Sequence, residues 1–152
     1  MRILSCLAFL LLAACTNGGT LTPAGGGGSA QIQTIDVNLT LNPSSQTPAG
    51  SAGGYSPAVT SVAVGTFVRF VNSDGFAHTA TAIAGATTFP AGSPFSSTAQ
   101  TQSGTAVSQN WSSGNLPAGA SSQTLLIDKA GTYLYGCFYH YGGPMRAEIV
   151  AH

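Results

Sequence analysis

Hydrophobic and polar positions alternate in short runs along much of the chain after residue 30. In the segment IQTIDVNLTL, residues 32–41, every second position from Ile35 to Leu41 is apolar and the positions between them are polar. A period of two residues is typical of a β-strand with one buried face. No segment shows a convincing helical period. The pattern predicts an all-β domain that begins near residue 31.

Six further runs are short, rich in β-branched or aromatic residues, and bounded by turn residues. Residues 42–57 are rich in proline, serine and glycine and are predicted to form a loop. Together with the first strand, the runs predict an antiparallel β-sandwich of about seven or eight strands. The six runs are 59–64, 66–72, 78–83, 123–128, 131–137 and 146–151.

Residues 84–122 form a long region that is rich in small and polar residues. Its few large side chains are Phe89, Phe95 and Trp111. The region could contain a strand around residues 109–112, or it could be a long surface loop that these aromatic side chains pin to the sandwich. We prefer the loop, with a structural role for Trp111 rather than a role in ligand binding.

The first fifteen residues, MRILSCLAFLLLAAC, resemble a bacterial lipoprotein signal. Arg2 supplies the basic start, and the apolar run 3–12 is too short to span a bilayer. The resemblance implies that residues 1–14 are a signal peptide that ends in a lipobox and that Cys15 carries a lipid. The alternative is an ordinary secretory signal with a chance cysteine. Both interpretations predict export.

Residues 15–30 contain four consecutive glycines and show no apolar periodicity. Such a composition is typical of a flexible tether, because it offers little that a folded domain could bury. We therefore expect a single domain, residues 31–152, that is attached through the lipid on Cys15 to a bacterial membrane and faces the periplasm or the cell exterior.

Charge is sparse in this chain, at 5% of all residues. After the predicted cleavage site, three basic side chains stand against four acidic ones, for a formal charge of −1. This balance excludes the basic surface of a nucleic-acid-binding protein and a polybasic membrane patch. We expect a monomer whose protein partners are not steered to it by strong charge.

Cys137 is the one cysteine expected in the mature domain, because Cys6 leaves with the signal peptide and Cys15 is lipidated. It begins the pattern Cys137-x2-His140-x4-Met145 at the end of a predicted strand. A thiolate, an imidazole and a thioether are soft to borderline metal ligands, and the thiolate and thioether together favour copper over zinc.

A trigonal copper site with a weak axial methionine needs two histidines and one cysteine. The second histidine must be His78 or His152. His152 is the last residue of the chain, where side chains are often poorly ordered, so His78 is the better candidate.

The segments FVRFVNSDGFAHT and AGTYLYGCFYHYGGPMRAEIVA resemble the two copper-ligand segments of the cupredoxins, especially the plastocyanin and pseudoazurin group. The resemblance covers roughly residues 31–152. It implies a Greek-key β-sandwich of about eight strands and one type 1 copper ion. By the same resemblance the copper ligands are His78, Cys137, His140 and Met145.

Some positions depart from the pattern of that family. Thr79 follows the first histidine where asparagine is common, and Phe138 follows the cysteine where serine or threonine is common. These departures put in question the hydrogen bond that ties the two ligand segments together in the family. Gly136 stands where plastocyanins carry an aromatic residue, and their acidic docking patch is missing. The redox partner is therefore expected to differ from theirs.

The four ligands fill the coordination positions of such a site and leave none open for a substrate. The expected function is that of a blue-copper electron carrier rather than an enzyme, with transient redox proteins as partners. The surface through which the electron passes is expected around His140, with Tyr141, Gly143, Pro144 and Phe76.

Two alternatives predict different behaviour toward copper. A copper-handling lipoprotein that stores or delivers the ion would surrender it to an acceptor, whereas a carrier would keep it in both oxidation states. A purely structural sandwich would bind no metal, but Met145 close to Cys137 argues against this alternative.

Overall fold

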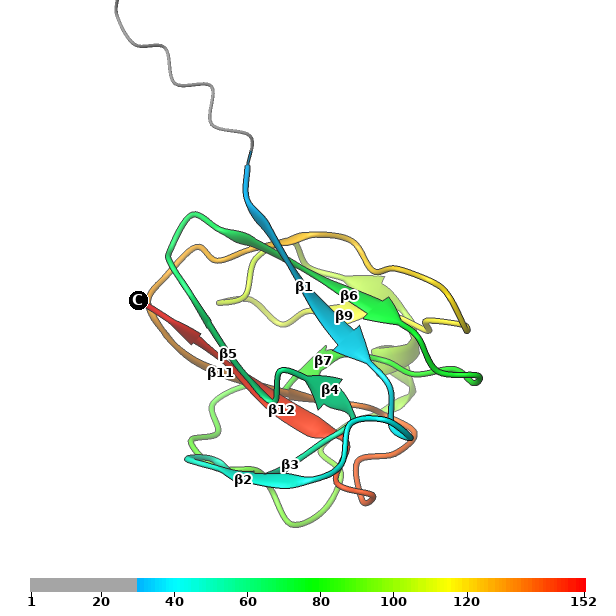
Figure 1. Ribbon diagram of the computed structural model, residues 1–152. Helices are drawn as coiled ribbons and strands as arrows, with labels where there is room; N and C mark the ends of the chain where they lie inside the picture. Colours follow the sequence, from blue (N-terminus) through cyan, green and yellow to red (C-terminus); the bar gives the residue numbers. More distant parts are fainter. Residues whose placement is uncertain (1–29) are drawn as a thin grey trace, which may run out of the picture.

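The computed structural model describes residues 30–152 (Figure 1). The predicted signal peptide, Cys15 and all but the last residue of the predicted tether lie outside the described residues. The described part contains twelve strands, several of them only two residues long, and one 3-10 turn. The elements are β1 (Ile32–Val37), β2 (Ser45–Thr47), β3 (Gly50–Ala52), β4 (Tyr55–Ser56), β5 (Val59–Val62), β6 (Phe67–Asn72), β7 (Thr81–Ala82), η1 (Ser97–Gln100), β8 (Gln102–Ser103), β9 (Ser112–Ser113), β10 (Leu125–Leu126), β11 (Gly131–Gly136) and β12 (Arg146–Ala151).

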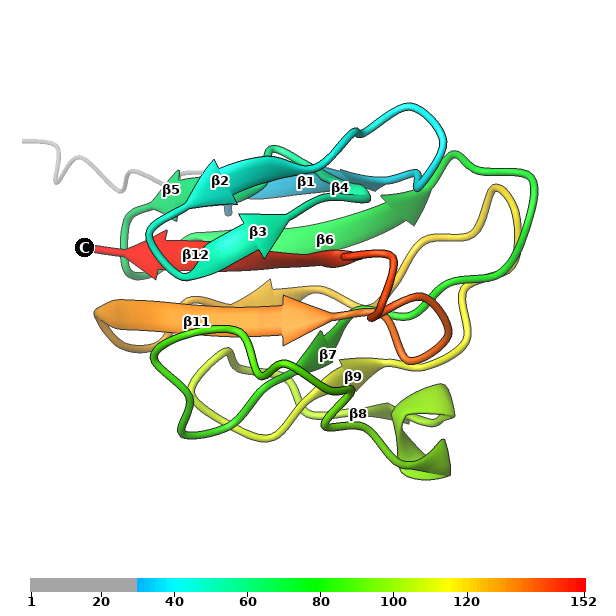
Figure 2. The same cartoon turned by 90° about the horizontal axis from the view of Figure 1, so that it is seen from below.

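Two main sheets pack face to face and confirm the predicted all-β sandwich (Figures 1 and 2). One sheet has the strand order β10-β6-β1-β4, and the other has the order β5-β12-β11-β7-β9-β8. A separate hairpin, β2-β3, flanks the start of β12. No helix in residues 30–152 is long and apolar enough to cross a membrane.

Not all neighbouring strands are antiparallel, so that part of the prediction was wrong. The pair β1 and β6 is parallel, and so is the pair β5 and β12. Periodicity shows which face of a strand is buried but carries no information on the direction of its neighbour. A parallel pair needs a long connection, and the segments β2 to β5 supply one between β1 and β6.

The core lies between the two sheets, and aromatic rings fill its centre. Phe70 on β6 stacks on Trp111 with ring centroids 5.5 Å apart, and Tyr135 on β11 packs edge-on against Phe70. Trp111 is only 2% exposed, which agrees with the structural role predicted for it. The strands of both sheets contribute further buried side chains to this core, among them Ile35, Val37, Val68, Ala147 and Ile149.

Several predicted boundaries change in the structure. β1 ends at Val37, because the Asn38 side-chain oxygen accepts a hydrogen bond from the Leu41 amide and turns the chain. Leu41 is 72% exposed and lies outside the strand that the alternation predicted. The predicted loop 42–57 contains β2, β3 and β4, and the region 84–122 contains η1, β8 and β9 in addition to loops.

Both predicted ligand segments lie at one end of the sandwich. β6 leads into residues 73–78, and the turn 137–145 joins β11 to β12, whose ends pair at Gly136 and Arg146. Ile32, the first residue of β1, pairs with Phe67 at the start of β6 and so lies at the opposite end. The domain therefore carries its ligand-bearing loops at the end away from Ile32.

Candidate metal centre

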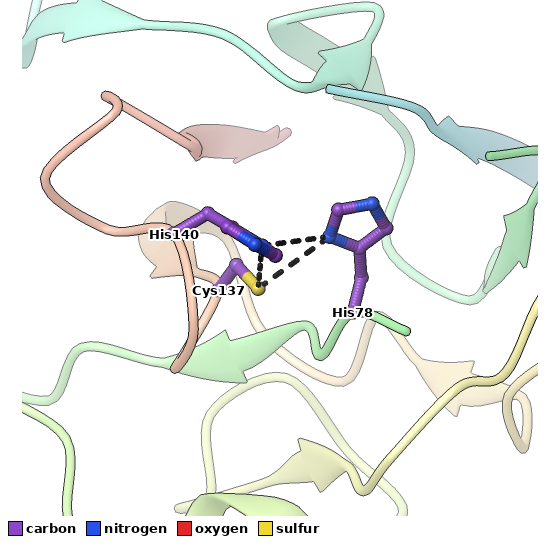
Figure 3. A group of neighbouring side chains, drawn as sticks. All are labelled: His78, Cys137 and His140. Atoms are coloured by element: carbon purple, nitrogen blue, oxygen red, sulfur yellow. Dashed lines mark hydrogen bonds between the residues drawn. The ribbon is translucent and has the colours of Figure 1, made fainter. Parts of the chain in front are cut away.

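Three ligand atoms from the two loops converge on one point (Figure 3). The Nδ1 atoms of His78 and His140 lie 3.2 Å apart. The Cys137 Sγ atom lies 3.8 Å from Nδ1 of His78 and 3.7 Å from Nδ1 of His140. His78 and Cys137 are fully buried, whereas His140 is partly exposed. The arrangement brings together three of the four ligands expected from the sequence.

Backbone hydrogen bonds shape the turn that carries Cys137, His140 and Met145. The Cys137 amide donates to the Met145 carbonyl at 3.0 Å. The amides of Gly143 and Met145 both donate to the His140 carbonyl, at 2.9 and 3.2 Å. These bonds close the turn and fix the starting direction of all three predicted ligands.

Met145 is fully buried at the end of this turn and belongs to the same hydrophobic cluster as Cys137. Gly54 packs directly against it. Gly54 has a φ of +72°, and a Cβ atom at this position would lie 2.5 Å from the Met145 Cγ atom. Glycine is therefore required here both by the backbone conformation and by the space that the methionine occupies.

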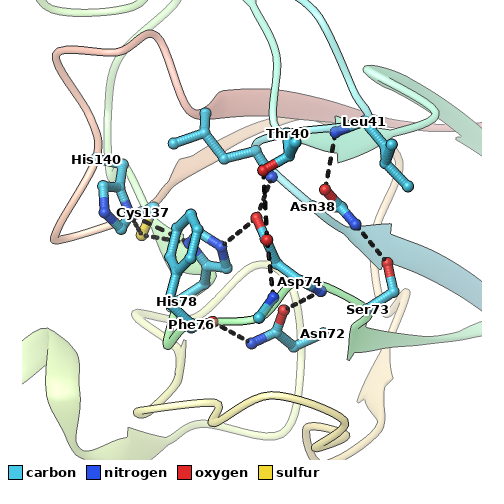
Figure 4. Close-up of polar contacts among 12 residues, drawn as sticks. Asn38, Thr40, Leu41, Asn72, Ser73, Asp74, Phe76, His78, Cys137 and His140 are labelled. Carbon is cyan, nitrogen blue, oxygen red and sulfur yellow. Dashed lines mark hydrogen bonds and ion pairs between the residues drawn. The ribbon is translucent and has the colours of Figure 1, made fainter.

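Side-chain hydrogen bonds shape the loop that carries His78 (Figure 4). The buried Asn72 side chain accepts from the Asp74 amide at 2.9 Å and donates to the carbonyls of Phe76 and Leu116, both at 2.8 Å. The backbone of His78 exchanges two hydrogen bonds with that of Leu116. The loop is thus held to the segment that follows β9.

Asp74 lies behind His78, on the side away from Cys137 (Figure 4). One carboxylate oxygen, Oδ2, lies 3.1 Å from the His78 Nε2 atom and accepts from the Leu39 amide at 2.9 Å, while Oδ1 accepts from the Gly75 amide at 2.8 Å. Burial by itself raises the pKa of Asp74, but the hydrogen bonds from His78, Gly75 and Leu39 outweigh it and lower the pKa below its ordinary value.

Thr79 connects the two loops. Its amide donates to the Cys137 Sγ atom at 3.4 Å, and its hydroxyl oxygen accepts from the Phe138 amide at 2.9 Å. The Tyr55 hydroxyl donates to the Thr79 carbonyl. The link that the residues Thr79 and Phe138 put in question is therefore present, because a threonine hydroxyl can accept the hydrogen bond that an asparagine side chain would accept.

The electrostatics of the site favour neutral donors until a cation binds. Burial raises the pKa of the Cys137 thiol, and hydrogen bonds from the backbone of Thr79, His140 and Tyr139 offset this only in part. Burial, followed by the neighbouring His78, lowers the pKa of His140. Without an ion the thiol keeps its proton, and binding of a cation would displace that proton. One sulfur and two imidazole donors fit copper, and the Met145 thioether is buried in the same hydrophobic cluster as Cys137.

The exposed surface around His140 differs in one respect from the prediction. Phe76 is 44% exposed, and its ring centroid lies 5.4 Å from that of His140. Gly143 is exposed and Pro144 is partly exposed. Tyr141, however, is only 1% exposed, so its predicted place on this surface was wrong.

Tyr141 points inward because it forms part of the support beneath the turn. Its ring packs under the Arg146 guanidinium, 5.0 Å from the ring centroid, and against Phe95, while its hydroxyl donates to the Pro90 carbonyl at 3.0 Å. The neighbouring tyrosine, Tyr139, is exposed at 40% and was not among the residues predicted to form this surface.

Comparison with known proteins agrees with this geometry. The sequence matches the family of copper binding proteins, plastocyanin/azurin family, over residues 46–152. No curated protein matches the chain. The structure is similar to a purple cupredoxin from Nitrosopumilus maritimus, with a TM-score of 0.50 and 21% identity over 78% of this chain and 98% of that chain. It is also similar to an amicyanin variant in its Cu(I) form, with a TM-score of 0.50 and 16% identity over 80% of this chain and 82% of that chain.

At these identities the solved structures show the fold, and the match to the family covers most of the chain and both ligand loops. His78 is the second histidine of the site, whereas His152 is exposed at the end of β12 remote from the loops. The ligand set His78, Cys137, His140 and Met145 is that of a type 1 copper site. The chain belongs to the plastocyanin/azurin family of copper-binding proteins.

Proposed function

We propose that this protein is a type 1 copper electron carrier that works as an exported, lipid-anchored domain. The observation that carries the proposal is the convergence of two imidazole nitrogens and one cysteine sulfur within 4.8 Å of one another. The family is one of electron carriers and not of enzymes. Copper bound by these residues would accept and release one electron.

The protein favours electron transfer by holding the copper ligands in a site that need not rearrange when the copper changes its oxidation state. Cys137 and His78 lie on loops that are tied together through Thr79, so we expect their donor atoms to move little when an electron is gained or lost. Full burial of both residues keeps water from the sulfur. A site that changes little between two oxidation states favours fast one-electron transfer.

His140 is the one imidazole of the site that reaches the surface. The surrounding patch consists of exposed Phe76, exposed Tyr139, Gly143 and the partly exposed Pro144. It is small and carries no ionised side chain, which suits a redox partner that docks briefly and separates quickly. We infer that electrons enter and leave through His140.

The position of Ile32 supports an orientation for the anchored domain. Ile32 lies at the end of the sandwich opposite the ligand loops, so a tether that joins the domain there would turn the copper end away from the membrane. A Cys15→Ala variant is expected to lose membrane attachment while its domain still binds copper. Recovery of that variant in the membrane fraction would contradict lipidation of Cys15.

The proposed function is tested by titrating the metal-free protein with Cu(II), beside a Cys137→Ser control. We expect an intense thiolate-to-copper absorption band and a narrow copper hyperfine splitting, both missing from the control. A weak, ordinary Cu(II) spectrum that does not depend on Cys137 would overturn the proposal.

A chelator challenge then separates an electron carrier from a copper-handling protein. A carrier keeps its copper through repeated reduction and oxidation in the presence of a competing chelator. Loss of Cu(I) to the chelator on the first reduction would favour storage or delivery of the ion instead.

A further inference from the structure

Asp74 is not a predicted copper ligand, but its side chain contacts the predicted ligand His78. Asp74 and His78 face each other across a hydrogen bond, with Oδ2 and Nε2 3.1 Å apart. The Asp74 side chain is only 6% exposed and that of His78 is fully buried. The contact uses the nitrogen of His78 that faces away from Cys137, because the other nitrogen, Nδ1, faces the sulfur (Figure 4).

The Asp74 carboxylate is held from several directions and cannot rotate freely. Oδ2 also accepts from the Leu39 amide, and Oδ1 accepts from the amide of Gly75. The Asp74 amide in turn donates to the Asn72 side chain. The carboxylate therefore keeps one place relative to the His78 ring.

We propose that Asp74 is a positioning residue of the copper site. It holds the proton of His78 on Nε2, so that Nδ1 offers its lone pair to copper. Its negative charge also stabilises Cu(II) relative to Cu(I). The inference rests on the proposed function and names a residue that tunes it.

The choice of tautomer follows from the donors and acceptors present. An ionised carboxylate only accepts hydrogen bonds, so the Nε2 atom that faces it must carry the proton. The Nδ1 atoms of His78 and His140 lie 3.2 Å apart, and two protonated nitrogens could not face each other at this distance. Asp74 removes the conflict because it draws the proton of His78 to the far side of the ring.

The preference for Cu(II) follows from charge. A buried negative charge that is hydrogen-bonded to a ligand attracts a doubly charged ion more strongly than a singly charged one. It also makes the imidazole a stronger donor, as partners behind metal-bound histidines generally do. The Asp74 carboxylate should therefore lower the reduction potential of the site.

The test compares Asp74→Asn with Asp36→Asn. Asparagine keeps the shape of the side chain and removes the charge. Its single oxygen can replace only one of Oδ1 and Oδ2, so either the Leu39 amide or the Gly75 amide loses its acceptor. The control, Asp36→Asn, removes an equal charge from a partly buried aspartate. The Asp36 side chain accepts a hydrogen bond from Asn42 rather than from a histidine. Two quantities are measured: the reduction potential of the copper-loaded proteins and the ring-nitrogen NMR shifts of His78 in the metal-free proteins.

We expect Asp74→Asn to raise the reduction potential by about 59 mV, which corresponds to a tenfold change in the ratio of the Cu(II) and Cu(I) affinities. Changes of about 10 to 100-fold in metal affinity are usual when such partners are removed. Asp36→Asn should change the ratio by less than about twofold, because water screens a partly exposed charge. In the metal-free wild-type protein, His78 should carry its proton on Nε2.

A potential for Asp74→Asn that equals that of Asp36→Asn would overturn the proposed tuning. A His78 proton on Nδ1 in the metal-free wild-type protein would overturn the positioning, and this measurement remains possible even where the variant does not fold. Neither result would contradict the proposed function. That function would be contradicted only if the wild-type protein showed no thiolate-to-copper absorption band.

Discussion

The two loops that supply the copper ligands are built in different ways. The loop 73–78 depends largely on side chains, because Asn72 and Asp74 make hydrogen bonds that fix its course, in addition to the backbone bonds between His78 and Leu116. The turn 137–145 is held by backbone-to-backbone hydrogen bonds and by the packing of Tyr141 beneath it. The first loop therefore depends on the identity of a few polar residues, whereas the second depends on the space around its backbone.

This difference decides which substitutions damage each loop. Removal of a buried polar side chain leaves its former partners without hydrogen bonds, so the first loop should be sensitive to truncation. Additional atoms beside a tightly packed turn force its neighbours apart, so the second should be sensitive to enlargement.

The largest effect is expected for Asn72→Ala. Its side chain is fully buried and makes three hydrogen bonds. Alanine would leave the Asp74 amide and the Phe76 carbonyl without this partner and would remove one of the two donors to the Leu116 carbonyl. We expect the free energy of unfolding of the metal-free protein to fall by about 3 to 4 kcal/mol, measured by urea denaturation.

The control for Asn72→Ala is Asn110→Ala, which truncates an exposed asparagine. Its effect should stay within about 0.5 kcal/mol, as is usual for surface positions. A loss below about 1 kcal/mol for Asn72→Ala would show that side chains do not hold the His78 loop, since a single buried hydrogen-bonding group is worth that much.

A smaller effect is expected for Gly136→Ala, at the start of the turn. A Cβ atom here would lie 2.9 Å from the Tyr141 ring and 3.1 Å from the Met145 carbonyl oxygen, both closer than normal packing allows. We expect a loss of about 2 kcal/mol in unfolding free energy and an altered copper absorption spectrum, because the turn must shift.

Gly142 provides the matched control within the same turn. A Cβ atom at Gly142 would meet nothing within 4 Å, so Gly142→Ala should leave both the stability and the spectrum unchanged. Equal effects of the two alanines would mean that flexibility of the glycines matters more than the space around them.

Thr79→Val tests the connection between the loops. Valine keeps the shape of threonine but cannot accept the hydrogen bond from the Phe138 amide. We expect a loss of about 1 kcal/mol, with Thr79→Ser closer to the wild type because serine keeps the hydroxyl. If serine costs more than valine, the methyl group rather than the hydroxyl links the two loops.

The sequence predicted the six-residue strands best. β11 and β12 lie within one residue of the predicted runs, although their buried positions do not alternate. β6 follows the predicted alternation throughout, and β1 follows it up to Val37. β7 and β10 have only two residues each, too few for a period to appear. The strands within residues 42–57 were not predicted, because the small and polar side chains there suggested a loop. These strands form through backbone hydrogen bonds to neighbouring strands, which the side-chain pattern does not show.

Some residues of the candidate site could also be predicted from the sequence, and others could not. Cys137, His140 and Met145 lie within nine residues, so their chemistry could be recognised from the sequence alone. Thr79 gains its role from Cys137, far along the chain, and Asp74 is held in place by the distant Leu39 amide although His78 lies only four residues from it. No local pattern marks the long-range contacts. Tyr141 was placed on the surface because a turn has no periodicity that tells an inward tyrosine from an outward one.

The smallest effect is expected for Tyr141→Phe, which separates the support beneath the turn from the surface above it. Phenylalanine loses the hydrogen bond to the Pro90 carbonyl but keeps a ring under Arg146. The unfolding free energy should fall by no more than about 1 kcal/mol, and the rate of electron exchange with a small soluble redox agent should not change. The Tyr141 ring is buried, so it should not take part in electron transfer. A slower exchange with an intact copper spectrum would place Tyr141 on the electron path. The support beneath the turn and the electron-transfer surface around His140 would then no longer be separate.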